Sequence, residues 1–112
     1  MNNDKNLSFI ICHYFCIFVP INPLTPIHME VKDLLSIAHT YGSPVYVYDA
    51  NKISSQYERL TKAFAAVPSL RINYAMKALS NVSILKLMRK LGAGLDTVSI
   101  QEVKLGLHAG FA

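Results

Sequence analysis

Two short segments with the character of strands, each followed by a segment with helical periodicity, constrain the fold of this chain more than any other feature. The first runs from Arg71 to Lys77 and the second from Leu95 to Ser99. A strand followed by a helix, repeated in the same order, is typical of a parallel sheet, because parallel strands need a crossover connection. The sequence therefore predicts an α/β fold with two βα units between Arg71 and Gly110.

Both predicted helices carry local start signals. Asn81 or Ser80 is a suitable N-cap for the first helix, and Ser99 with Glu102 has the form of a capping box for the second. The second helix is expected to end near Gly110. Apolar residues at helical spacing form the core face of the first helix: Ile84, Leu85, Met88 and Leu91.

The segment before these units also has helix and strand signals. Residues 31–38 have helical spacing, and residues 45–48 (VYVY) are typical of a short strand. Asp49 is a good N-cap for a further helix. One apolar stripe along that helix contains Ile53, Tyr57, Leu60 and Phe64.

Residues 1–28 differ in composition from the rest. The apolar run from Leu7 to Val19 is shorter than the roughly 20 residues that span a bilayer. A secretory signal is one interpretation, although Asp4, His13 and the lack of a clear cleavage site argue against it. We favour the other interpretation, in which translation begins at Met29 and residues 1–28 are a mis-annotated start.

Composition narrows the classes of function. The net charge is +4, but the basic residues are scattered, which argues against nucleic-acid binding. Cys12, His13 and Cys16 lack a fourth ligand for zinc nearby, so we expect no metal site. Because the rest of the chain has no cysteine, a reduced cytoplasmic setting without a structural disulfide is the simpler expectation.

Lys77 is the strongest candidate in the sequence for a chemically active residue. Alternation along a strand would put Ile72, Tyr74 and Met76 on one face and Asn73, Ala75 and Lys77 on the other. An ordinary interpretation is a strand-end lysine that reaches solvent. In a barrel, however, the C-terminal end of a strand is where chemistry takes place, and small Ala75 would leave room for a flat ligand.

The stretch from Tyr41 to Phe111 resembles the fold-type III, pyridoxal-phosphate-dependent decarboxylases. The matching pieces are residues 41–49 (YGSPVYVYD), 74–78 (YAMKA) and 94–99 (GLDTVS), together with Glu102. In that family the lysine of the Tyr-Ala-x-Lys-Ala motif carries the cofactor as a Schiff base. The resemblance thus implies pyridoxal 5′-phosphate as cofactor and Lys77 as the catalytic, cofactor-binding residue.

The same resemblance implies that Asp96 is a second cofactor-binding residue, close to the lysine. A loop-capping carboxylate is the alternative interpretation of Asp96, and a capping box is sufficient to explain Glu102. Tyr74 is best explained by packing. The chain departs from the family at Leu79, where Lys-Ala-Asn is usual.

For the fold, the resemblance implies the opening portion of an alanine-racemase-like (β/α)₈ TIM barrel. A complete barrel needs about 250 residues, so it is incomplete in this chain. Residues 1–28 would be an apolar leader or mis-annotated start. Residues 29–49 would be a helix and strand that join a second, β-rich domain, and residues 50–112 the first βα units of the cofactor-binding barrel.

For function, the resemblance implies a cytoplasmic carboxy-lyase of lysine biosynthesis that acts on the small amino acid meso-diaminopimelate and is a homodimer when full length, with no membrane partner. Ornithine, arginine or carboxynorspermidine are alternative substrates. A non-catalytic truncated product is a further alternative. The family's phosphate loop and substrate arginine have no counterpart in the 112 residues, so we expect this chain alone to be inactive.

Overall fold

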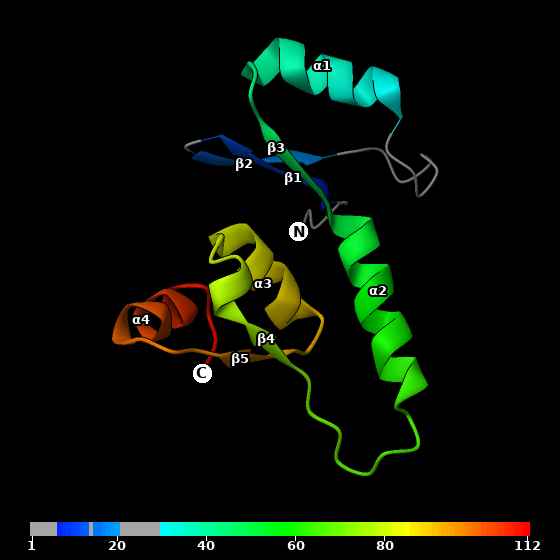
Figure 1. The fold of residues 1–112 in the computed structure, drawn as a ribbon, viewed down its shortest axis with the longest axis vertical. Coiled ribbons are helices and arrows are strands. Elements are labelled where there is room, and N and C mark those ends of the chain that lie inside the picture. The colour runs from blue at the N-terminus through cyan, green and yellow to red at the C-terminus, as the bar shows by residue number, and fades with distance from the viewer. Residues whose placement is uncertain (1–6, 14, 21–29) are drawn as a thin grey trace, which may run out of the picture. The chain divides into compact units, whose positions relative to one another are not determined.

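The computed structural model describes residues 7–13, 15–20 and 30–112, which belong to two compact units, residues 1–53 and 54–112. Figure 1 shows the elements of both units. The helices begin where the local signals of the sequence predict them, whereas the ends of the predicted strands differ from the prediction.

The first unit contains a three-stranded antiparallel sheet with the order β2-β1-β3. Its strands are β1 (Leu7–His13), β2 (Phe15–Pro20) and β3 (Tyr46–Asp49). Strand β1 pairs with β3 from Phe9↔Asp49 to Cys12↔Tyr46. Residues within the predicted leader therefore form the backbone partner of β3, and the choice of translation start stays a prediction.

Helix α1 (Val31–Tyr41) confirms the helix predicted from residue 31 and extends it to Tyr41. Gly42 follows with φ of 85°, and its N–H donates to the carbonyl oxygen of Ala38 at 2.9 Å. A positive φ is a conformation that glycine adopts at little cost, so Gly42 ends the helix.

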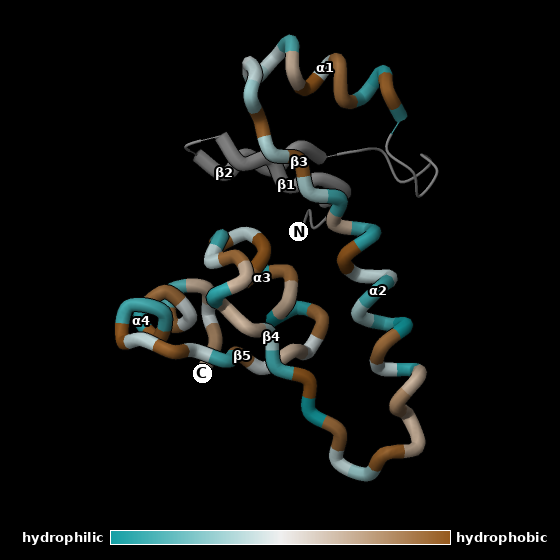
Figure 2. The backbone as a smooth tube through the Cα atoms, viewed as in Figure 1, coloured by the Kyte–Doolittle hydropathy of each residue, from teal (hydrophilic) through white to brown (hydrophobic). Residues whose placement is uncertain are grey.

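Helix α2 (Ala50–Ala63) begins at the predicted cap, because the Asp49 carboxylate accepts a hydrogen bond from the Lys52 N–H at 2.9 Å. The predicted apolar stripe is only partly covered. Ile53 and Tyr57 are half-buried, whereas Leu60 and Phe64 are 43% and 48% exposed. Figure 2 shows apolar and polar residues interleaved along this helix.

The second unit contains the two predicted βα units. Strand β4 (Asn73–Ala75) is followed by α3 (Val82–Lys90), and β5 (Gly94–Asp96) by α4 (Ile100–His108). The strands are parallel, with the register Asn73↔Gly94, Tyr74↔Leu95 and Ala75↔Asp96. This arrangement confirms a mixed α/β fold with a small parallel sheet.

The strand bounds predicted from the sequence are wrong at both sites. Strand β4 ends at Ala75, and Met76–Ala78 form a 3₁₀ turn, η1, so the alternation expected to extend to Lys77 stops earlier. Met76 is fully buried within the core cluster, and the turn leads the chain toward α3. The second strand ends at Asp96 because residues 97–99 form the loop that caps α4.

The core of the second unit is formed by Met76, Leu85 and Ala109. Ile84, Leu85 and Met88 are buried as predicted, whereas Leu91 is half-buried. Helix α4 approaches β5 closely at Gly106, where an added Cβ would collide with the end of the Leu95 side chain. Apolar packing of α3 and α4 thus holds strands β4 and β5 in place.

Candidate functional site

The C-terminal ends of β4 and β5 bring the two predicted site residues to one edge of the sheet. Ala75 and Asp96 are register partners and are the last residues of their strands. Lys77 lies in the turn that begins directly after Ala75. Both Lys77 and Asp96 are exposed, whereas Ala75 is half-buried. Neighbouring strands are about 4.8 Å apart, so the Lys77 amine and the Asp96 carboxylate are carried by segments at the ends of adjacent strands.

Tyr74 stabilises the turn that carries Lys77. The Tyr74 side chain packs against the Met76, Leu85 and Ala109 cluster, as predicted. Its hydroxyl also donates a hydrogen bond to the carbonyl oxygen of Leu79 at 3.0 Å. Sequence reasoning missed this bond, because a contact between residues five apart depends on the turn geometry.

Three residues, 79–81, separate this turn from helix α3, and Asn81 caps the helix. Asn81 is 9% exposed, and its side-chain oxygen accepts hydrogen bonds from the backbone N–H groups of Ser83 at 2.9 Å and Ile84 at 3.3 Å. Of the two caps that the sequence left open, the structure selects Asn81 rather than Ser80. The cap satisfies backbone donors that an α-helix leaves without intrahelical partners.

The loop after Asp96 is held by a second cap. The Ser99 hydroxyl accepts from the Glu102 N–H at 3.2 Å, and the Glu102 carboxylate accepts from the Val98 N–H at 2.7 Å. The predicted capping box is thus confirmed with one difference: the carboxylate reaches the residue before the N-cap rather than the N-cap itself. Glu102 therefore has a structural role in fixing the loop between Asp96 and α4.

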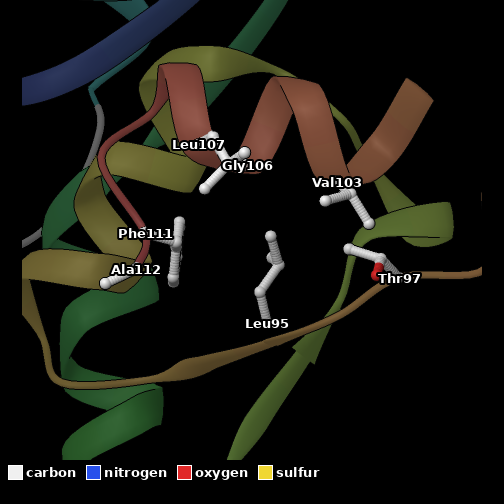
Figure 3. Close-up of a pocket in the computed structure, with 7 residues that line it drawn as sticks. All are labelled: Leu95, Thr97, Val103, Gly106, Leu107, Phe111 and Ala112. Atoms are coloured by element: carbon white, nitrogen blue, oxygen red, sulfur yellow. The ribbon is translucent and has the colours of Figure 1, made fainter. Parts of the chain in front are cut away.

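A pocket of about 190 Å³ lies between β5 and α4, and Figure 3 shows the residues that line it. Its lining is apolar apart from Thr97, with Leu95, Val103, Leu107 and Phe111 contributing side chains. These residues have no ionisable group that could bind or transfer a proton. A second pocket, of about 360 Å³, includes Asn73 and Gly94 at the opposite, N-terminal ends of the strands. Lys77 and Asp96 line neither pocket.

The donor set at the strand ends fits one end of a pyridoxal-type cofactor. An exposed lysine supplies an amine that can form an imine, and a carboxylate follows on the neighbouring strand. Ala75, the last residue of β4, adds only a small side chain at this strand end. The fit concerns this end of the cofactor alone.

A metal site is not found among residues 30–112, whose side chains the structure describes. Within that range no three His, Cys, Asp or Glu side chains lie close enough together to hold a metal ion. The side chains of Cys12, His13 and Cys16, which the sequence suggested as an incomplete cluster, lie outside the described part.

The fold and the site together define a class: a βα domain whose parallel strands end in a lysine-bearing turn and a carboxylate. The pyridoxal-binding domain of the pyridoxal-dependent decarboxylases matches residues 50–112. The chain belongs to this family, as the motifs around Lys77 and Asp96 led us to expect.

Curated relatives with the name diaminopimelate decarboxylase are similar to most of the chain. The protein of Aquifex aeolicus is 43% identical over 82 residues, which are 73% of this chain and 19% of the relative. That of Methanothermobacter thermautotrophicus is 38% identical over 80 residues, 70% of this chain and 19% of the relative. That of Helicobacter pylori is 48% identical over 71 residues, 63% of this chain and 17% of the relative. The chain spans about a fifth of the length of these relatives.

No solved structure matches the chain significantly. Within the described residues, none of the helices combines the length and the apolar character needed to cross a membrane.

Proposed function

We propose that this chain supplies the lysine-bearing part of a pyridoxal-phosphate-dependent carboxy-lyase that converts meso-diaminopimelate to L-lysine. The observation that carries the proposal is the parallel register Ala75↔Asp96, with Lys77 in the turn that follows. It supports the proposal because Lys77 and Asp96, to which the resemblance assigns the imine and the cofactor-binding carboxylate, follow adjacent strand ends. The names of the relatives support diaminopimelate as the substrate.

In this proposal each residue of the sheet edge has a separate task. The Lys77 amine would hold the cofactor covalently through its nitrogen, with the aldehyde oxygen of the cofactor leaving as water. The Asp96 carboxylate orients the bound group from the neighbouring strand end. Pyridoxal phosphate, when bound, supplies an electron sink for the electron pair left when carbon dioxide departs. The caps formed by Asn81 and Glu102 keep the two loops in place.

The proposal extends to the wider architecture. We infer that residues 50–112 form the opening βα units of a (β/α)₈ barrel, with residues 29–49 joining a second, β-rich domain. The resemblance also supports a homodimer in the cytoplasm. Ile100 and Leu107 of α4 are apolar and are 61% and 59% exposed. These two side chains support the barrel inference, because further elements of a barrel would cover such a face.

A second candidate is a non-catalytic product of the same family. For a catalytic protein, the alternatives are decarboxylases of ornithine, arginine or carboxynorspermidine.

The test uses the complete gene product. Carbon dioxide release is measured with meso-diaminopimelate, ornithine, arginine and carboxynorspermidine at equal concentrations, in the presence of pyridoxal phosphate. We expect turnover with meso-diaminopimelate and formation of L-lysine. Greater turnover with another substrate would overturn the substrate assignment, and no turnover with any of them would favour the non-catalytic product.

A further inference from the structure

The hydroxyl of Tyr74 forms a bridge across the turn that carries Lys77. Tyr74 is the middle residue of β4, and its hydroxyl donates to the Leu79 carbonyl oxygen at 3.0 Å. The bond begins before the 3₁₀ turn Met76–Ala78 and ends after it, at a residue with extended backbone (φ −164°, ψ 114°). Lys77 is the central residue of the bridged turn.

The bridged 3₁₀ turn is only three residues long, Met76–Ala78. A 3₁₀ turn of this length has room for few backbone hydrogen bonds, and their geometry is poorer than in an α-helix. Before Lys77 the chain is fixed by Met76, which is fully buried. After it, Leu79 is fixed by Tyr74, and Asn81 caps α3. The exposed Lys77 thus lies between two fixed positions, and the hydrogen bond of Tyr74 holds the segment that follows the turn at Leu79.

We propose that Tyr74 is a positioning residue for Lys77: its hydroxyl bridge sets where the lysine backbone leaves the end of β4. This inference rests on the proposed function and goes beyond it, since packing alone would require only the aromatic ring. A reacting group displaced by about 1 Å can lose about 10²-fold in rate. A bond that fixes the turn therefore acts on the chemistry of the amine without touching the ligand.

The ring and the hydroxyl of Tyr74 can be separated experimentally. The ring packs against the core cluster, whereas the hydroxyl makes the bridge. Tyr74→Phe keeps the ring and removes the bridge. Tyr57→Phe is the matched control, because Tyr57 is also half-buried but belongs to α2 and lines the pocket at the N-terminal ends of the strands.

The experiment has one readout without cofactor and one with it, both on the complete gene product. In the cofactor-free protein, amide hydrogen exchange of the peptide covering residues 76–80 should be at least about fivefold faster in Tyr74→Phe than in wild type. With pyridoxal phosphate added, covalent capture by Lys77, followed by borohydride trapping, should be at least about tenfold slower. Tyr57→Phe should change neither. Placing 4-aminophenylalanine at position 74, which restores an N–H donor, should recover the capture rate.

The outcomes separate this inference from the proposed function. If wild type captures the cofactor at Lys77 and Tyr74→Phe matches it in exchange and capture, the positioning role is wrong and the proposed function stands. If wild type captures no cofactor at Lys77, the proposed function fails and the positioning role with it. If Tyr74→Phe and Tyr57→Phe slow capture equally, the effect is a general one of losing a hydroxyl, which also overturns the positioning role.

Discussion

Ala75 and Asp96 are paired across the parallel strands β4 and β5, each as the last residue of its strand. The polypeptide leaves the sheet after both residues and enters loops that are fixed by side-chain hydrogen bonds. Because Lys77 lies just beyond Ala75, this pair locates the amine and the carboxylate on neighbouring chain segments.

Replacing Lys77 should remove covalent attachment of the cofactor. In the complete gene product, Lys77→Ala should lose the yellow absorbance and the borohydride-trapped label on the peptide that contains residue 77. Turnover should fall by at least roughly 10³-fold, equivalent to about 4 kcal/mol of transition-state stabilisation. Lys77→Arg should not restore it, because a guanidinium stays protonated and forms no imine.

The matched controls are lysines on the helices that follow the strands. Lys86 and Lys90 belong to α3 and Lys104 to α4, and all three are exposed like Lys77. Their alanine variants should keep the trapped label and the absorbance. A label trapped on any of these three lysines, with Lys77→Ala still yellow and active, would contradict the assignment.

Replacing Asp96 should have a milder effect than replacing Lys77. Asp96 is exposed at the end of β5, so its charge acts partly through solvent. We expect Asp96→Ala to keep covalent attachment and to lose about tenfold in turnover, equivalent to about 1.4 kcal/mol. Asp96→Asn should show whether the charge or the size of the side chain matters. Complete loss of the trapped label in either variant would place Asp96 in attachment itself.

Local signals in the sequence predicted the helix starts well, because a cap involves residues next to each other in the chain. Asp49, Asn81 and Ser99 all cap the helices expected of them. The family motif singled out Lys77 and Asp96 as cofactor-binding residues, and this assignment stays a prediction, although the register brings both residues to one sheet edge.

The strand ends could not be predicted in the same way. Alternation of Ile72, Tyr74 and Met76 is compatible with a strand that continues to Lys77, and the burial of Met76 suits either a strand or a turn. The choice depends on how the chain must turn to reach α3. The hydrogen bond from Tyr74 to Leu79 depends on the same turn, so it has no signature in the spacing.

The cap at Asn81 should contribute measurably to stability. Asn81→Ala leaves the N–H groups of Ser83 and Ile84 without this acceptor, in a buried environment. We expect the free energy of unfolding to fall by about 1–2 kcal/mol in denaturant titrations of the cofactor-free gene product. Ser80→Ala is the control, because Ser80 is exposed and was the alternative cap. Equal losses in the two variants would mean that the cap assignment is wrong.

The role of Glu102 can be separated into structure and chemistry by comparing two substitutions. The Glu102 carboxylate accepts the Val98 N–H at 2.7 Å, and a glutamine can accept the same bond through its amide oxygen. Glu102→Ala should therefore lower the free energy of unfolding by about 1 kcal/mol, and Glu102→Gln by a few tenths. Turnover of Glu102→Gln should remain within about twofold of wild type. If Glu102→Gln kept its stability but lost turnover by tenfold or more, the carboxylate charge would be part of the chemistry, and the capping role alone would not explain the residue.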